Sequence, residues 1–359
     1  MAVHAEHGRG ALHLPPVVAV VGPTATGKTA LAVRLARALG GAELVNADSR
    51  QVLRGLRVGT NTPSPADLAG LPCHLLGIAD PGEPFSVADW LAAARSCLTD
   101  LKGRGALPIL VGGTGLYVRA LLDGADLDGP PPDPRRRASL NARAATPEGL
   151  AALAGELRRV DPDGAAAIDL HNPRRVVRAL EIVEDRGSLA ARGRSGALGP
   201  GLRLGLDAAP SLLRRWITER SRAMLGAGLL DETRDALHGG VAAEVLGGCG
   251  IGYREALEVL AGRLSEAAAA AEIVRRTLRY ARAQRTWFRA DHRIVWLHRE
   301  GEGDLDALVG QALELMAGDG PPGLAPDVPP AGPEHTSGTS VCAEPGSVLQ
   351  SSLPRHAER

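Results

Sequence analysis

A glycine-rich segment near the start of the chain has the residue types and spacing of a phosphate-binding loop. Residues 22–29, GPTATGKT, match the pattern G-x-x-x-x-G-K-[ST]. In such a loop glycine lets successive backbone N–H groups point at a phosphate, lysine adds a positive charge, and the last hydroxyl can ligate Mg²⁺. We predict phosphate binding by Gly22, Pro23, Thr24, Ala25, Thr26, Gly27, Lys28 and Thr29, with Thr29 as the metal ligand.

The segments on either side of this loop are those that a phosphate loop requires. Valines before Gly22 predict a buried strand over residues 17–21, and apolar residues at helical spacing predict a helix over 29–39. A chance glycine turn between a strand and a helix is the alternative interpretation. The order of strand, loop and helix favours the phosphate loop.

Two further predicted strands, 43–46 and 107–111, end in residues that could do chemistry. Asp48 follows the first of them, and Thr114 lies in the glycine turn after the second. Because ligands of open parallel sheets bind beyond the carboxyl ends of the strands, we expect Asp48 to lie near the phosphate loop. There it would hold magnesium or remove a proton from an acceptor, whereas a helix cap is the structural alternative.

The glycine turn after residue 111 allows two roles for Thr114. Its hydroxyl could fill a tight turn, or it could donate to a leaving-group oxygen, since the flanking glycines let a phosphate approach. Gly112 occupies the strand-end position at which many nucleotide triphosphatases carry an acidic residue. Its presence argues against a motor or a hydrolytic switch.

The pattern of elements predicts an α/β fold, a P-loop parallel-sheet core with an inserted all-helical subdomain. A proline-rich break at residue 126 is followed by alanine, arginine and leucine at helical spacing, and Asn172-Pro173 predicts a helix start. Further helices are expected at 86–102, 211–238 and 267–289, with a terminal strand at 294–297. The predicted parts are a flexible tail 1–15, a core from 16–125 and 202–300, a helical insertion 126–201 and a disordered tail 318–359.

Composition and charge narrow the class of protein. The 359 residues contain 41 Lys+Arg and 41 Asp+Glu, so a polyanion must be bound by local basic patches and not by the overall field. Four dispersed cysteines favour neither disulfides nor structural zinc. The sequence has no run of about eighteen apolar residues, so we expect a soluble cytoplasmic protein that does not bind a membrane.

Two groups of arginines could contact nucleic acid. One group, Arg174, Arg175 and Arg178, lies on the helix predicted after Asn172-Pro173. The other is a row on helix 267–289, with no acidic residue between its first and last members: Arg275, Arg279, Arg282 and Arg289. Such rows are often solvated faces, but both groups could bind an RNA backbone.

The residue patterns alone leave three classes of function open. They are a phosphate-loop transferase, an ATP-consuming nucleotide or small-molecule kinase with nucleotide-binding by the same loop, and a non-catalytic RNA-binding protein.

Nine sequence blocks, spread from about residue 17 to residue 297, closely resemble the tRNA dimethylallyltransferase family. They are GPTATGKT, NADSRQV, GTNTPSP, HLLGIADPGEPFSVADW, VGGTGLYVRALLDG, NPRRVVRALEIVE, GLLDETR, GIGYREA and YARAQRTWFR. The chain departs from the family pattern at Leu53, Cys73, Gly77 and Cys249. None of these positions is the expected base, the loop lysine or Thr114.

The resemblance implies transfer of a dimethylallyl group from dimethylallyl diphosphate to the exocyclic amine of the adenosine 3′-adjacent to the anticodon. It implies that the first loop binds diphosphate, that Asp48 is the general base, and that Lys28, Thr114, Arg220 and Mg²⁺ at Thr29 stabilise the leaving group. The partner would be a tRNA anticodon stem-loop bound by a monomer. The implied RNA contacts are Asp48, Ser49, Arg50, Gln51, Arg174, Arg175, Arg178 and Arg282.

Overall fold

The computed structural model describes residues 17–124, 133–189, 197–198 and 201–318. The chain forms two compact units, a core unit up to Leu122 and from Leu198 onward, and a helical unit from Asp123 to Ala197. The tail predicted at residues 1–15 and nearly all of the tail predicted at 318–359 lie outside the described residues.

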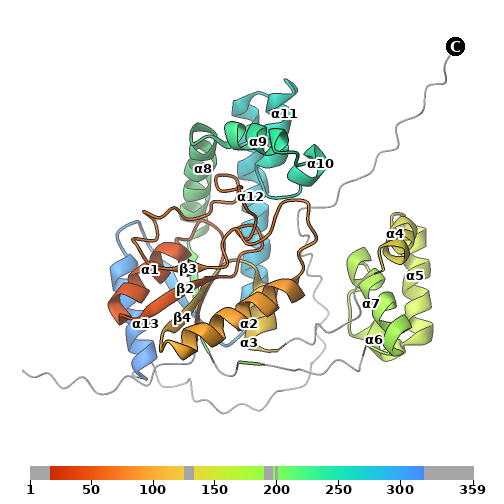
Figure 1. The fold of residues 1–359 in the computed structure, drawn as a ribbon, viewed down its shortest axis with the longest axis horizontal. Helices are drawn as coiled ribbons and strands as arrows, with labels where there is room; N and C mark the ends of the chain where they lie inside the picture. The colour runs from red at the N-terminus through yellow and green to blue at the C-terminus, as the bar shows by residue number, and fades with distance from the viewer. Residues whose placement is uncertain (1–16, 125–132, 190–196, 199–200, 319–359) are drawn as a thin grey trace, which may run out of the picture. The chain divides into compact units, whose positions relative to one another are not determined.

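A six-stranded parallel sheet forms the centre of the core unit, which confirms the predicted α/β fold (Figure 1). Its strand order is β3-β2-β4-β1-β5-β6, and all neighbouring strands run parallel. The strands are β1 (Val18–Val21), β2 (Ala42–Asn46), β3 (Cys73–His74), β4 (Leu107–Val111), β5 (Leu202–Ala208) and β6 (Ile294–Arg299). Because β2, β4 and β1 are adjacent, the residues that follow them meet at one edge of the sheet.

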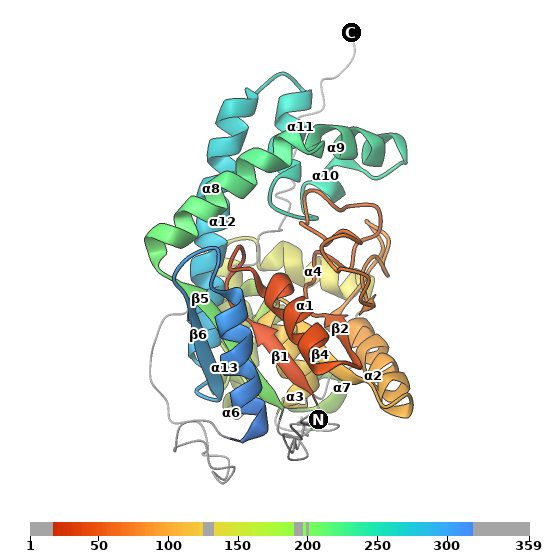
Figure 2. The ribbon, with the colours of Figure 1, turned by 90° about the vertical axis from the view of Figure 1, so that its left-hand side faces the viewer.

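Two helices that are distant in sequence pack together against the sheet. These are α1 (Lys28–Leu39) and α13 (Leu305–Ala317), which Figure 2 shows in front of β1. Their buried side chains form one cluster with the strands, for example Leu31, Leu308 and Val20. Sequence analysis placed no element after residue 297 and so missed α13. Its buried residues nevertheless recur at helical spacing, which is the signal that could have found it.

Helices α2 (Val87–Gly103) and α3 (Gly115–Leu122) fix the carboxyl end of β2. The helix predicted at 86–102 is confirmed as α2, and Ser86 and Asp89 form a capping box at its start. Trp90 of α2 stacks on Tyr117 of α3 with ring centroids 4.3 Å apart. The Trp90 indole N–H donates to the carbonyl oxygen of Asn46 at 3.1 Å. Asn46 ends β2, so this contact sets the position from which the chain continues to Asp48.

A group of helices lies beyond the carboxyl end of the sheet (Figures 1 and 2). They are α8 (Pro210–Gly226), α9 (Leu229–His238), α10 (Ala243–Leu246), α11 (Tyr253–Leu260) and α12 (Glu266–Arg289). The helical stretch predicted at 211–238 is divided into α8 and α9 between Gly226 and Leu229. A buried cluster that includes Leu56, Tyr253 and Ile273 joins them to the chain that follows β2. None of the helices in the described ranges is long and apolar enough to cross a bilayer.

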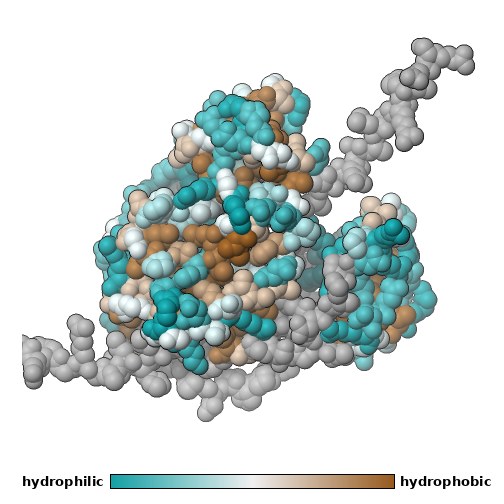
Figure 3. Space-filling model, viewed as in Figure 1, coloured by the Kyte–Doolittle hydropathy of each residue, from teal (hydrophilic) through white to brown (hydrophobic). Residues whose placement is uncertain are grey.

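The helical unit is built from four helices that start in the same way. They are α4 (Pro134–Arg143), α5 (Pro147–Val160), α6 (Pro162–Ala166) and α7 (Pro173–Arg186). Each begins with proline in the first turn, preceded by a side chain that caps the helix: Asp133, Thr146, Asp161 or Asn172. The start predicted at Asn172-Pro173 is therefore confirmed. Leucines and valines of these helices form a separate core, and the face of the unit seen in Figure 3 is mostly hydrophilic.

Candidate active site

The first loop, between β1 and α1, has a backbone shape that suits a bound phosphate. Ala25 and Gly27 have positive φ angles of 67° and 86°, a backbone conformation that turns neighbouring N–H groups toward one side. Gly22 lies so close to β5 that a Cβ there would be 2.3 Å from the carbonyl oxygen of Leu206. Because α1 begins at Lys28, the positive end of the helix dipole adds to the attraction for an anion.

Two partly buried cations reach this loop. Lys28 Nζ donates to the carbonyl oxygen of Pro23 at 2.7 Å, and Arg220 Nη1 donates to Thr24 Oγ1 at 3.0 Å. Burial lowers the pKa of Lys28 to about 8, although the charge of Asp48 opposes this shift, and burial lowers the pKa of Arg220 to about 10. Arg220 Nε is buried and has no hydrogen-bond partner within the described ranges. Two positive charges withdrawn in part from water favour a bound anion at this place.

Asp48 lies at the same edge of the sheet, as its position after β2 predicts. Its Oδ1 accepts from the backbone N–H of Arg50 at 2.9 Å, and its own N–H donates to Asn46 Oδ1 at 3.1 Å. A Cβ added to Gly113 would lie 3.6 Å from Asp48 Oδ2, so this oxygen faces the glycine turn. One carboxylate oxygen of Asp48 is therefore held by the backbone, while the other faces the glycine turn after β4.

Thr114 and Ser49 form a pair of hydroxyls across two strand ends. Thr114 Oγ1 accepts from the backbone N–H of Ser49 at 2.9 Å and donates to Ser49 Oγ at 3.1 Å. Thr114 is 8% exposed, so the pair of hydroxyls lies almost wholly out of bulk water. Sequence analysis gave Ser49 a role toward RNA alone, and its contact with Thr114 was missed.

Comparison with known proteins identifies the family. The IPP transferase family model matches residues 51–291, more than half of the chain, and the isopentenyl transferase family model matches residues 15–76. A tRNA dimethylallyltransferase of Salinispora tropica is 44% identical over 302 residues, covering 84% of this chain and 92% of that protein. The chain belongs to the tRNA dimethylallyltransferase family.

Other members of the family are similar over the same extent. A tRNA dimethylallyltransferase of Geobacillus kaustophilus is 38% identical and is covered over 96% of its length. The crystal structure of a tRNA isopentenylpyrophosphate transferase from Bacillus halodurans has a TM-score of 0.62 at 36% identity, covering 84% of this chain and 95% of that one. A eukaryotic dimethylallyltransferase acting on tRNA, 22% identical with a TM-score of 0.71, shares the fold.

In this member of the tRNA dimethylallyltransferase family, the residues after Asp48 bind to other parts of the core unit. Arg50 Nη1 donates to the carbonyl oxygen of Gly248 at 2.9 Å, and Gln51 Nε2 donates to the carbonyl oxygen of Asn61 at 2.9 Å. Both side chains are partly exposed. These contacts fix the segment that the family resemblance assigns to RNA recognition.

The structure brings three residues to the site that sequence analysis did not identify. Gln284 of α12 lies between the first loop and the glycine turn. Glu232 and Tyr253 bind each other and hold the segment after Asp48. The signal for Gln284 was a polar residue on the buried face of α12, in line with Ala281 and Phe288. No local pattern distinguished Glu232, because its backbone partners are more than 170 residues away.

The predicted row of free arginines on α12 is wrong in part. Arg275 pairs with Glu272 at 2.5 Å, and Arg289 pairs with Asp207 at 3.4 Å. Both acids lie outside the interval that sequence analysis searched, and Asp207 is brought there by the fold. Arg279 and Arg282 are exposed, and Arg282 stays a candidate for contact with RNA.

The arginines predicted for RNA on the helical unit differ in their surroundings. Arg174 and Arg175 are exposed in the first turn of α7. Arg178 is half-buried and donates to the buried Glu181 at 3.1 Å, beside Arg137. Its guanidinium is thus already paired with a carboxylate, an interaction that a phosphate contact would have to replace.

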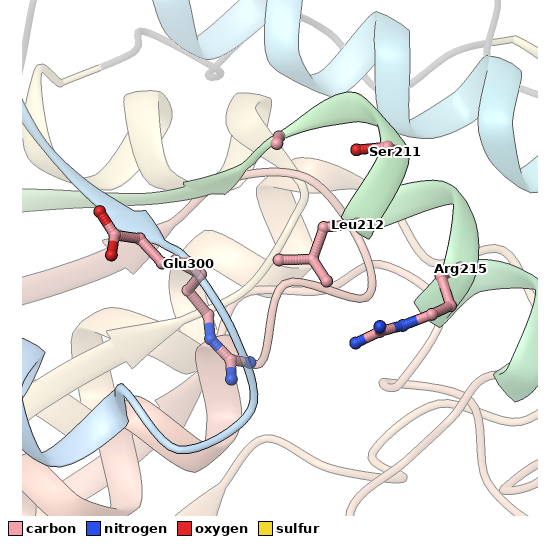
Figure 4. Close-up of a pocket in the computed structure, with 6 residues that line it drawn as sticks. Ser211, Leu212, Arg215 and Glu300 are labelled. Atoms are coloured by element: carbon pink, nitrogen blue, oxygen red, sulfur yellow. The ribbon is translucent and has the colours of Figure 1, made fainter.

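A hollow of about 600 Å³ lies at the start of α8, away from Asp48 and Thr114. Figure 4 shows Ser211, Leu212 and Arg215 on α8 at one side of it and Glu300 at the other, with the Glu300 carboxylate pointing away from α8. Arg299 also lines the hollow, and its Nη1 donates to the carbonyl oxygen of Thr26 at 3.3 Å. The hollow therefore touches the back of the phosphate loop and contains none of the predicted catalytic side chains.

Proposed function

We propose that this protein transfers the dimethylallyl group of dimethylallyl diphosphate to the exocyclic amine of the adenosine 3′-adjacent to the anticodon of tRNA. The observation that carries the proposal is the closeness of Asp48 to two partly buried cations, Lys28 and Arg220, at the first loop. Relatives named tRNA dimethylallyltransferase support a transferase over the alternative kinase. An anion site opposite a carboxylate suits a reaction that releases diphosphate and removes a proton.

Each residue has a separate task in this reaction. The adenine amine is a weak nucleophile because its lone pair is delocalised, so Asp48 accepts its proton as the new C–N bond forms. The bond between the prenyl carbon and the diphosphate oxygen breaks, and its electron pair leaves with the diphosphate. Lys28 and Arg220 stabilise that charge, and Thr114 turns its hydroxyl from Ser49 to the departing oxygen. The adenine must leave its base stack to reach Asp48.

The residues present fit a magnesium ion. Thr29 at the start of α1 offers one hydroxyl oxygen, and no cluster of three His, Cys, Asp or Glu side chains occurs where the structure is described. A single protein ligand suits Mg²⁺, which is usually held by one or two protein groups together with phosphates and water. When bound, the ion would neutralise part of the diphosphate charge.

The RNA is bound by side chains of both units. Ser49, Arg50 and Gln51 contact the flipped base or its neighbours, since they follow Asp48 directly. Arginine side chains contact the phosphate backbone of the anticodon stem-loop, and the number of contacts sets the salt dependence of binding. This set is Arg174, Arg175, Arg178 and Arg282.

Incubation with Mg²⁺, dimethylallyl diphosphate and an anticodon stem-loop tests the proposal, with the RNA weighed by mass spectrometry. We expect the RNA to gain the mass of one dimethylallyl group, and to lose this gain when the target adenosine is replaced by guanosine. ATP turnover without RNA modification would support the kinase. RNA binding with neither activity would support a non-catalytic binder.

The affinity for diphosphate should fall as pH rises above about 8. The pKa of Lys28 is about 8, so above this pH the free site loses its ammonium and must take up a proton to bind the anion. The dissociation constant, measured by calorimetry with inorganic diphosphate, should therefore rise by up to about tenfold per pH unit. Lys28→Met serves as control, because it retains only the pH dependence of the ligand itself.

Stability of the free protein should change with pH in the opposite direction. Between about pH 8 and the ordinary pKa of lysine the unfolded chain binds more protons at Lys28 than the folded chain does. Stability therefore rises with pH in this window. Comparison of urea unfolding of wild type and Lys28→Met at pH 7.5 and pH 9.5 isolates this contribution. For the binding prediction, a diphosphate affinity of wild type that does not change from pH 7.5 to pH 9.5 would contradict a role of the Lys28 ammonium in binding the anion.

A further inference from the structure

Gln284 of α12 connects the two loops that would hold the diphosphate. Its Oε1 accepts from the backbone N–H of Thr24 at 2.8 Å, and its Nε2 donates to the carbonyl oxygen of Gly113 at 2.9 Å. Thr24 lies in the first loop after β1, and Gly113 lies in the turn after β4. Gln284 is only 5% exposed, so these two hydrogen bonds form away from bulk water.

The partners of Gln284 determine how its amide must lie. The backbone N–H of Thr24 can only donate, and the carbonyl oxygen of Gly113 can only accept. Only a side chain with one acceptor and one donor at this spacing satisfies both, and a glutamine amide has them in the required order. A carboxylate would place a second acceptor against the carbonyl oxygen of Gly113.

The surroundings hold Gln284 close to the reacting groups. A Cβ added to Gly113 would lie 2.2 Å from Gln284 Nε2 and 3.6 Å from Asp48 Oδ2, so the amide and the carboxylate converge on this glycine. One turn later on α12, Trp287 closes the glycine turn, since a Cβ on Gly115 would lie 1.9 Å from its indole nitrogen. The amide therefore meets the glycine turn at the point that Asp48 faces.

Contacts on either side of Gln284 fix α12 and the first loop. Arg285, the next residue, donates to Asp207 Oδ1 at 2.6 Å and to the carbonyl oxygen of Ala208 at 2.8 Å, which ties α12 to the end of β5. Thr24, which binds Gln284 through its N–H, also accepts from Arg220 through its hydroxyl. The amide thus acts from a fixed helix on a loop residue that a partly buried cation also contacts.

We propose that Gln284 is a positioning residue that sets the separation of the first loop and the glycine turn. Glycine-rich segments have little conformational preference of their own, so a buried bridge between them restricts where Thr24 and Thr114 face the diphosphate. The inference rests on the proposed function for its role in catalysis. The bridge itself predicts an effect on the binding of diphosphate alone, without RNA.

Gln284→Met tests the inference, because methionine has a similar length and neither donates nor accepts strongly. We expect the dissociation constant for inorganic diphosphate with Mg²⁺, measured by calorimetry, to rise about tenfold, since two hydrogen bonds are lost. The rate of RNA modification should fall while the affinity for the stem-loop stays unchanged. Gln284→Glu should weaken diphosphate binding further, because it adds a negative charge beside the anion.

Thr286→Ala is the matched control, since Thr286 is exposed on the same helix and its hydroxyl donates to the carbonyl oxygen of Arg282 in the preceding turn. It should leave diphosphate affinity unchanged. Gln284→Asn, one methylene shorter, replaces Gln284→Met if the latter fails to fold, and it should also weaken binding. A folded variant with wild-type diphosphate affinity and only a lower melting temperature overturns the inference. Weakened diphosphate binding without any RNA modification by wild type would instead refute the proposed function and leave the bridge supported.

Discussion

Asp48→Asn is expected to lower the rate of RNA modification about 1,000-fold, a typical loss when a general base is removed. Asparagine has the same shape, and its oxygen can still accept from the N–H of Arg50, as Asp48 Oδ1 does at 2.9 Å. Its amide cannot accept the proton of the adenine amine. Single-turnover measurement with saturating dimethylallyl diphosphate and stem-loop RNA would give the rate of the chemical step.

Two further measurements separate the loss of a base from damage to the site. Asp48 raises the pKa of Lys28, so in Asp48→Asn the decline of diphosphate affinity with pH should begin at a lower pH than in wild type. Asp80→Asn is the matched control, because Asp80 also lies between β2 and α2 but is half exposed and pairs with Arg54. It should be fully active. A rate within tenfold of wild type in Asp48→Asn would exclude the carboxylate as the base.

The parts of the site that the sequence predicts are those determined by local pattern. The loop from Gly22 to Thr29 follows from glycine spacing and from the conformations that glycine permits. The place of Asp48 follows from one topological rule, that the ends of parallel strands meet at one edge. Neither prediction needs knowledge of which distant residues approach the site.

The parts that the sequence does not predict depend on long-range packing. Gln284 meets Thr24 and Gly113 across separations of 260 and 171 residues, and a single polar residue on a buried helix face does not reveal its partners. The neutralisation of Arg289 by Asp207 likewise requires β5 to lie beside α12. Charge counted along one helix therefore overestimates the positive surface that RNA would meet.

Glu232→Ala is expected to destabilise the core unit by about 3–5 kcal/mol, because it leaves four donors without their partner, and two of these donors belong to the buried residues Gly59 and Tyr253. The Glu232 carboxylate accepts from three consecutive backbone N–H groups, those of Arg57, Val58 and Gly59, at 2.5, 2.8 and 3.0 Å. It also accepts from the hydroxyl of Tyr253 at 2.7 Å. Chemical denaturation would measure the loss.

The effect should be concentrated in the segment that follows Asp48. Gly59 packs so closely on Tyr253 that a Cβ there would lie 2.3 Å from the ring, so the segment has no other position while Tyr253 stays buried. Hydrogen exchange of the amides at 57–59 should accelerate in Glu232→Ala more than that of α1. The modification rate should then fall through misplacement of Arg50 and Gln51, with inorganic diphosphate binding retained.

Asp231→Ala provides the matched control for Glu232→Ala. Asp231 is the adjacent acid on α9, exposed and paired with Arg234 at 2.6 Å, and an exposed pair contributes at most about 1 kcal/mol. Tyr253→Phe removes one of the four hydrogen bonds and should cost about 1 kcal/mol. If Glu232→Ala were no less stable than Asp231→Ala, the carboxylate would not hold the segment. The position of the segment would then have to come from the apolar contacts of Leu56 with Leu229 and Tyr253 alone.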